Sequence, residues 1–326
     1  MKAILIREPG DEAVLQLGET ADPAPQSDEL LIRVRATAVN RADLLQRQGL
    51  YPPPQGASPV LGLECAGEVV GVGSSVTGWK EGDRAMALLA GGGYAELVAV
   101  HHGSVMHVPA SLEWTEAGAL PEVFLTAYLN LFELGAVSHG GSVLVHGGGS
   151  GVGTAAIALC REAGVRCMVT AGSEDKLERC RALGASVAID YREGDFAPKV
   201  AEATSKQGVD VVLDCVGGRY LAQNVDCLAL DGRLVIIGLI GGAKAEINLA
   251  KLLMRRLQVI GSTLRTRSNE QKQQLVASFV SRFGDAIAAG RVRPTVETVF
   301  PLADAAAAHR LVQSSKHFGK VVLSVP

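Results

Sequence analysis

A glycine-rich turn near the middle of the chain restricts the possible folds more than any other feature. Residues 143–145 (VLV) are a short apolar run of the kind found in buried parallel strands, and the glycine-rich segment 147–153 follows them. Residues 154–163 then carry apolar side chains at helical spacing. A strand, a glycine turn and a helix in this order form the setting of a dinucleotide-binding fingerprint, where the backbone approaches a pyrophosphate at a helix N-terminus. The candidate ligands of that pyrophosphate are Gly149, Ser150, Gly151, Val152 and Gly153.

The match to the fingerprint G-x-G-x-x-G is imperfect. Its nearest register is Gly148, Ser150 and Gly153, with serine in place of the second glycine. A single fingerprint is weak evidence, and the alternative is a glycine-rich turn that binds nothing. Residues 146–149 (HGGG) imitate the oxyanion-hole motif of lipases, but no G-x-S-x-G nucleophile motif follows, which argues against a lipase.

Composition indicates a globular chain with more than one domain. The 326 residues are 48% hydrophobic and 20% charged, which is enough for two domains with substantial cores. The formal net charge of -3, without a basic cluster, predicts no nucleic-acid or membrane partner. No stretch resembles a signal peptide or a membrane span, so we expect a cytoplasmic protein. The six cysteines include no C-x-x-C pair and are expected to be small buried residues.

The pattern of elements divides the chain. Residues 1–115 show short β-type runs separated by turn signals, with one helix candidate at 40–48, which suggests a compact barrel-like domain. After a helix expected at 123–134, strands and helices alternate, which predicts a parallel doubly wound sheet. The strands are expected at 143–145, 167–170, 186–190, 209–213, 233–237 and 259–264, and the helices at 151–163, 174–183, 195–205, 220–229, 249–255 and 269–289. The tail returns to β-type residues and is expected to rejoin the first domain, giving domains 1–122 with 292–326 and 123–291.

The end of the second strand of this sheet favours NADPH over NADH. NAD sites usually place an acidic residue there to bind the ribose 2′-hydroxyl. Here the strand ends without an acid, and Gly172 and Ser173 leave room for a phosphate. Lys176 and Tyr191 are candidates to bind that phosphate, although they equally fit a surface lysine and a packed loop aromatic. The nearby acids at 174 and 175 fit the first turn of a helix.

Three short motifs resemble the signature of the medium-chain dehydrogenases/reductases. They are 62–67 (GLECAG), 71–73 (GVG) and 82–84 (GDR). Zinc-dependent members of that family carry cysteine at the position of Asn40 and histidine at the position of Leu63, and neither residue present here is a usual zinc ligand. The four-cysteine structural zinc lobe is also missing.

The chain is more similar to the zinc-free quinone oxidoreductase branch of this family. The shared features are 40–44 (NRADL), 150–153 (SGVG) and 319–322 (GKVV). Longer strings are similar to the tumour-suppressor-inducible subgroup of that branch, at 40–51, 85–93, 214–218 and 224–232. The resemblance implies an α/β fold made of a GroES-like β-barrel catalytic domain and a Rossmann domain. It further implies zinc-free transfer of reducing equivalents from NADPH to a quinone between the domains, in a homodimer paired through the edge strand 259–264.

Hydride transfer of this kind needs few side chains, because the cofactor carries the chemistry and the protein orients the acceptor. A hydrogen-bond donor near the acceptor oxygen should help, and Tyr51 and Asn40 are the candidates. Tyr51 equally fits packing on the proline run, and Asn40 equally fits a helix N-cap. By resemblance, further cofactor contacts are expected from Thr126, Gly238, Leu239, Ile240, Leu264 and Lys320.

Two other functions remain open at this point. An enone or alkenal double-bond reductase would need the same hydride geometry and would differ in its substrates. A non-catalytic NADPH-binding protein would bind the cofactor without turnover.

Overall fold

The structure is a computed structural model that describes residues 1–326. The contacts between its residues divide it into two units. Unit 1 comprises 1–125 and 265–326, and unit 2 comprises 126–264. None of the helices is long and apolar enough to cross a membrane.

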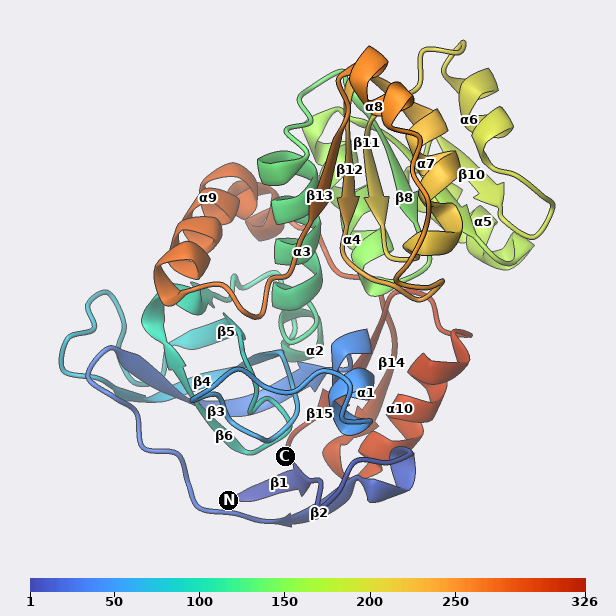
Figure 1. Cartoon of the computed structure of the whole chain (residues 1–326). Coiled ribbons are helices and arrows are strands. Elements are labelled where there is room, and N and C mark those ends of the chain that lie inside the picture. Colours follow the sequence, from blue (N-terminus) through green and yellow to red (C-terminus); the bar gives the residue numbers. More distant parts are fainter. The chain divides into compact units, whose positions relative to one another are not determined.

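Unit 2 is built on a six-stranded parallel sheet (Figure 1). Its strands are β8 (Ser142–His146), β9 (Arg166–Ala171), β10 (Val187–Asp190), β11 (Val209–Asp214), β12 (Leu228–Ile236) and β13 (Gln258–Gly261). They lie in the order β10-β9-β8-β11-β12-β13, so the order reverses between β8 and β11. In doubly wound sheets, ligands bind outside the carboxyl ends of the strands at such a reversal.

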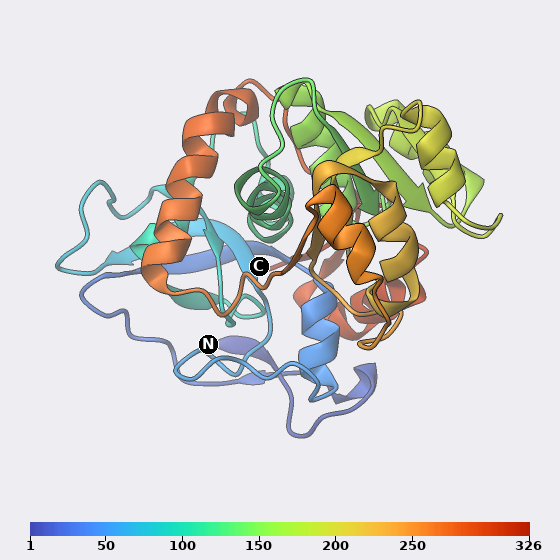
Figure 2. The same ribbon diagram turned by 45° about the horizontal axis from the view of Figure 1, so that its top comes forward.

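Helices connect successive strands and cover the sheet. They are α4 (Gly151–Ala163), α5 (Glu174–Leu183), α6 (Ala197–Ala203), α7 (Leu221–Cys227) and α8 (Leu249–Arg255). Figures 1 and 2 show α7 and α8 in front of the sheet and α4 behind it. Between them, Leu144, Met168, Val212 and Leu234 from four adjacent strands form part of the buried core.

Unit 1 contains the strands of the first and last parts of the chain, which pair antiparallel except for the last two, which are parallel to each other. They are β3 (Glu29–Ala38), β4 (Glu64–Val72), β5 (Arg84–Leu88), β6 (Leu97–His101), β7 (Val105–His107), β14 (Val296–Pro301) and β15 (Lys320–Ser324), with β1 (Lys2–Leu5) and β2 (Gln16–Glu19) as a separate pair. The long strand β3 pairs with β4, β6 and β15. The tail of the chain thus joins the sheet of the first part through the pairing of β15 with β3.

The helices of unit 1 lie around these strands. They are α1 (Arg41–Arg47), α2 (Trp114–Ala117), α9 (Asn269–Ala288) and α10 (Ala305–Ser314), with the start of α3 (Pro121–Tyr128). We predicted residues 265–291 as part of the dinucleotide-binding domain, but their contacts place them in unit 1. The reason is that α9 packs against β7 and the short helix η2 (His102–Ser104).

Most element positions agree with the sequence-based expectations. The helices predicted at 151–163, 174–183 and 249–255 coincide with α4, α5 and α8. The helix predicted at 123–134 differs, because α3 ends at Tyr128 and the chain continues as a π-helix, η3 (Leu129–Leu134). The strand predicted at 259–264 lies at the sheet edge as expected, but ends at Gly261.

Candidate functional site

The glycine turn after β8 leaves no room for side chains at two positions. A Cβ on Gly148 would lie 2.6 Å from Cβ of Val169, and a Cβ on Gly153 would lie 2.3 Å from the carbonyl oxygen of Gly147. Glycine is therefore needed at 148 for the turn to pass β9, and at 153 for α4 to pack against the turn. Gly147 has a φ of +72°, in the left-handed region that glycine favours.

The serine in the fingerprint has a structural role. Ser150 is the N-cap of α4, and its Oγ accepts a hydrogen bond of 3.0 Å from the backbone N–H of Gly153. The first N–H groups of a helix have no intrahelical partner, so Gly151 and Val152 present donors at the positive end of α4. The turn therefore fits a pyrophosphate, and the serine does not weaken that fit.

At the end of β9, the predicted phosphate-binding residues lie together. Ala171 and Asp190 are paired in the β9–β10 register, so Gly172 and Tyr191 follow at the same level. A Cβ on Gly172 would lie 2.3 Å from the Tyr191 hydroxyl oxygen, so the hydroxyl rests on this glycine. Ser173 is the N-cap of α5 and accepts a hydrogen bond from the backbone N–H of Lys176.

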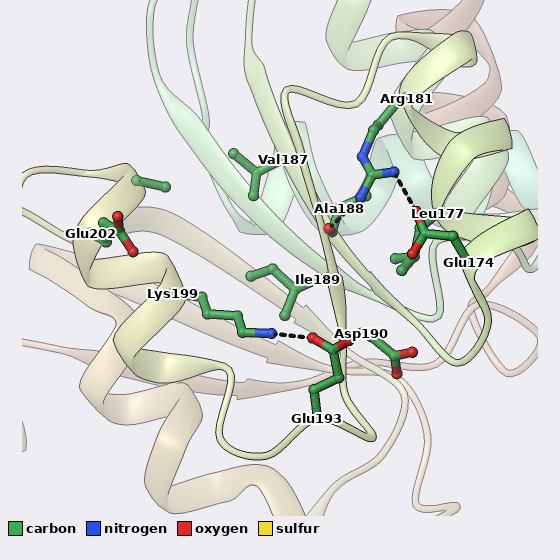
Figure 3. Close-up of a pocket in the computed structure, with 11 residues that line it drawn as sticks. Glu174, Leu177, Arg181, Val187, Ala188, Ile189, Asp190, Glu193, Lys199 and Glu202 are labelled. Carbon is green, nitrogen blue, oxygen red and sulfur yellow. Dashed lines mark hydrogen bonds and ion pairs between the residues drawn. The ribbon is translucent and has the colours of Figure 1, made fainter.

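The two acids in the first turn of α5 are paired with arginines. Glu174 lies 2.8 Å from Arg181, and Asp175 lies 4.0 Å from Arg179. Their negative charges are therefore partly compensated, which reduces their repulsion of a phosphate at Gly172. A hollow of about 660 Å³ lies between α5, β10 and α6. Figure 3 shows the Arg181–Glu174 pair among the residues that line it.

Three of the remaining cofactor candidates of unit 2 follow β12, and one follows β13. Gly238, Leu239 and Ile240 come after the end of β12, with Leu239 and Ile240 exposed by 55% and 69%. Leu264 follows β13 and is buried. The carboxyl end of the sheet is thus the common position of these residues and the two turns above.

Thr126 lies on α3, where it meets a buried asparagine. Its carbonyl oxygen accepts a hydrogen bond of 2.7 Å from Nδ2 of Asn130. Asn130 is 1% exposed, and its Oδ1 has no hydrogen-bond partner.

A buried polar network beneath the glycine turn was missed by the sequence analysis. The His146 ring nitrogens lie 3.0 Å from Oγ1 of Thr170 and 2.7 Å from Oδ1 of Asn224, whose Nδ2 donates to Asp214. Asp214 also accepts backbone hydrogen bonds from Val216 and Gly217. Burial lowers the pKa of His146 to about 4, so the ring is neutral at physiological pH. The network joins the carboxyl ends of β8, β9 and β11 and fixes the loops that start there.

In unit 1, Asn40 belongs to a buried ionic network. Lys320 donates hydrogen bonds to the Val39 carbonyl (3.1 Å), to Oδ1 of Asn40 (2.6 Å) and to Oε1 of Glu64 (2.7 Å). Nδ2 of Asn40 also donates to Oε1 of Glu64 at 2.9 Å, and Oε2 of Glu64 accepts from the Glu122 backbone at 2.9 Å. Lys320 and Glu64 are 3% and 0% exposed. The Asn40 amide is therefore held by charged partners on both of its polar atoms.

Lys320 was predicted to contact the cofactor, which stays a prediction, and the structure shows which groups hold its ammonium. An ammonium group has three hydrogens to donate, and all three are engaged within unit 1. The structure assigns Lys320 to the positioning of Asn40 and to the compensation of the Glu64 charge.

Tyr51, the other catalytic candidate, is held by an arginine that the sequence analysis did not select as a site residue. The Arg265 guanidinium lies over the Tyr51 ring, 5.3 Å from its centroid. It donates to the carbonyl of Ala90 (2.8 Å), to Oε1 of Gln46 (2.7 Å) and to the Tyr51 carbonyl (3.4 Å). Burial raises the pKa of Tyr51, and the Arg265 charge opposes that rise. Tyr51 and Asn40 thus flank α1, each fixed by a buried basic residue.

Other acids of this cluster have raised pKa values. Burial raises the pKa of Asp43 to about 6, although its carboxylate accepts backbone hydrogen bonds from Asn40 and Gly62. Burial and the Glu64 charge raise the pKa of Glu122 to about 8. No group of three or more His, Cys, Asp or Glu side chains is placed to hold a metal ion.

Comparisons with known proteins agree with this architecture. Residues 26–110 match the family model for the alcohol dehydrogenase GroES-like domain, and residues 151–282 match the model for zinc-binding dehydrogenases. The chain is 31% identical to a quinone oxidoreductase of Rattus norvegicus over 326 residues, covering 99% of this chain and 97% of that protein. It is 35% identical over 328 residues to a phenolphthiocerol/phthiocerol polyketide synthase subunit of Mycobacterium tuberculosis, covering 98% of this chain but 15% of that protein.

Two solved structures show the same fold over nearly the whole chain. The Escherichia coli quinone oxidoreductase, solved in complex with NADPH, has a TM-score of 0.88 at 29% identity and covers 99% of this chain and all of its own. The CurK enoyl reductase has a TM-score of 0.88 at 30% identity, covering 100% of this chain and 99% of its own. The chain therefore belongs to the medium-chain dehydrogenase/reductase superfamily, as a member with a GroES-like unit and a Rossmann-type unit.

Proposed function

We propose that this chain is an NADPH-dependent oxidoreductase that reduces a quinone without zinc. The observation that carries the proposal is the end of β9, where Gly172 lies against the Tyr191 hydroxyl and no acid takes the place that would bind a 2′-hydroxyl. The glycine turn at 148–153 packs closely against β9 and its own backbone, and the N-terminus of α4 that follows it offers backbone N–H groups to a pyrophosphate. The similarity to a quinone oxidoreductase solved with NADPH supports the same cofactor and acceptor class.

When bound, NADPH would supply the hydride. The glycine turn and the N-terminus of α4 would hold the pyrophosphate, while Lys176 and Tyr191 would receive the 2′-phosphate. The Tyr51 hydroxyl would orient the acceptor carbonyl and stabilise the negative charge that develops on its oxygen. The predicted role of Asn40 as a second donor does not fit the structure, because its amide hydrogens are engaged by Oε1 of Glu64 and the Ala38 carbonyl. Arg265 keeps Tyr51 in place, and Lys320 keeps Asn40 and Glu64 in place.

Reduction of an activated carbon–carbon double bond is the second candidate. It is favoured by the similarity to an enoyl reductase and to a segment of a polyketide synthase. Both reactions need hydride delivery next to a carbonyl whose oxygen gains negative charge, so the site described above serves either one. The acceptor therefore has to be identified by its turnover.

A panel of acceptors tests the proposal. We expect NADPH to be oxidised faster with 1,2-naphthoquinone than with an alkenal. With 1,2-naphthoquinone as the acceptor, we expect NADH to be oxidised much more slowly than NADPH. In Tyr51→Phe, kcat/KM for the quinone should fall about tenfold or more because a donor to the developing charge is lost, while NADPH affinity stays unchanged. Faster turnover of the alkenal would favour the second candidate, and NADPH binding without turnover on any acceptor would contradict both.

The edge strand of unit 2 supports a homodimer. β13 pairs only with β12, and Val259 on β13 is 42% exposed. On the adjacent helix α8, Leu253 and Met254 are 77% and 75% exposed. We propose that a second copy covers this edge and these apolar side chains. Sedimentation showing only monomer at micromolar concentration would contradict this assembly.

A further inference from the structure

Arg192 lies next to the proposed 2′-phosphate site in the sequence and was not among the predicted site residues. Arg192 directly follows Tyr191, whose backbone N–H donates to the carbonyl of Ala171 at the end of β9. Asp190 is paired with Ala171 in the strand register, so the segment 190–192 leaves the sheet beside Gly172. Arg192 therefore lies one residue from the hydroxyl proposed to bind the phosphate.

The Arg192 guanidinium is oriented by Asp190. Nε of Arg192 lies 3.1 and 3.2 Å from the two Asp190 oxygens, and Nη2 lies 2.7 Å from Oδ2. The Arg192 backbone N–H also donates to Oδ1 at 2.8 Å. Asp190 is nearly buried, whereas the Arg192 side chain is 57% exposed. The carboxylate thus fixes one edge of the guanidinium and leaves Nη1 without a hydrogen-bond partner.

The acidic side chains around this pair have basic partners, which reduces their repulsion of an anion. Glu174 is paired with Arg181, and Glu193 with Lys199, at 2.8 Å each (Figure 3). Asp175 is paired with Arg179. The pKa of Asp190 is lowered to about 2 by its hydrogen bonds from Arg192, so the pair persists at physiological pH. A planar guanidinium fixed on one edge can donate to a phosphate oxygen from its other edge.

We propose that Arg192, oriented by Asp190, is a specificity-determining residue that binds the 2′-phosphate of NADPH together with Tyr191 and Lys176. This inference rests on the proposed use of NADPH and adds a residue to that site. It predicts an effect on NADPH that NADH does not share, because NADH lacks the 2′-phosphate. A purely structural role in the 190–192 turn would affect both cofactors alike.

The test compares dissociation constants for NADPH and NADH in four proteins: wild type, Arg192→Gln, the double variant Asp190→Asn with Arg192→Gln, and Arg256→Gln. The double variant removes the Asp190 charge, which would otherwise be left unpaired beside the phosphate. Arg256 is the matched control. It makes a similar exposed bidentate pair with Asp231, at 2.7 Å for both contacts, but lies near the start of β13, at the opposite end of the sheet.

We expect the dissociation constant for NADPH to rise about tenfold in both Arg192 variants, as for the loss of one charge-assisted hydrogen bond, with NADH binding nearly unchanged. Arg256→Gln should bind both cofactors like wild type. Wild-type NADPH affinity in the double variant, or a parallel loss of NADPH and NADH affinity, would overturn the assignment of Arg192. Failure of the wild-type protein to bind NADPH would instead overturn the proposed function itself.

Discussion

Replacing Lys320 by methionine should destabilise unit 1 strongly. The substitution keeps most of the side-chain volume but removes the ammonium that lies 2.7 Å from Glu64 and 2.6 Å from Asn40. The Glu64 carboxylate, which is fully buried, would keep only the Asn40 amide and the Glu122 backbone N–H as donors. Removing one partner of a buried ion pair typically costs about 3–5 kcal/mol, because the remaining charge is left uncompensated.

Urea unfolding measures this cost. We expect the free energy of unfolding of Lys320→Met to fall by about 4 kcal/mol. The control is Arg256→Met, which breaks an exposed ion pair with Asp231 and should cost about 0–1 kcal/mol. Adding Glu64→Gln to Lys320→Met should recover part of the loss, since it removes the buried charge. If Lys320→Met costs no more than the control, the network does not hold Glu64 and Asn40 as described.

Three further predictions concern the rest of the structure. Gly153→Ala should abolish measurable NADPH binding, because its Cβ would lie 2.3 Å from the Gly147 carbonyl; cofactor binding at wild-type affinity would refute the close approach. Arg265→Lys keeps the positive charge but loses the planar guanidinium that contacts Tyr51. The KM for the acceptor should therefore rise severalfold, while the dissociation constant for NADPH stays the same. The pKa of His146 is about 4 in the folded protein, so its ring stays neutral there, whereas the same histidine in the unfolded chain takes up a proton below about pH 6.5. The free energy of unfolding should therefore fall by up to about 3 kcal/mol from pH 6.5 to pH 4. His146→Gln should show a shallower fall, and an unchanged slope between these pH values would contradict the buried neutral ring.

Local patterns predicted unit 2 well. The strand-and-helix alternation placed α4, α5 and α8 at their observed residues, because caps and glycines mark their ends. Ser173 caps α5 as expected, and Gly164 and Gly184 end α4 and α5 in the left-handed conformation. The π-helix after Tyr128 was not predicted, since the register of its hydrogen bonds depends on packing rather than on a local signal.

The partners of buried charged residues could not be predicted. Lys320 starts the last strand, and its sequence position does not show that its ammonium meets Glu64, 256 residues earlier. Arg265 and Tyr51 are also far apart in the chain, by 214 residues. The His146 network joins three strands and a helix through contacts that only the folded sheet creates. Candidate residues were thus found by type and motif, whereas the groups that position them required the structure.

The most direct test of the proposed activity is steady-state oxidation of NADPH with 1,2-naphthoquinone by the wild-type protein, with NADH in parallel. We expect turnover with a kcat/KM for NADPH well above that for NADH, because the end of β9 has room for a phosphate and offers no acid to a 2′-hydroxyl. Equal use of the two cofactors, or a preference for NADH, would contradict it.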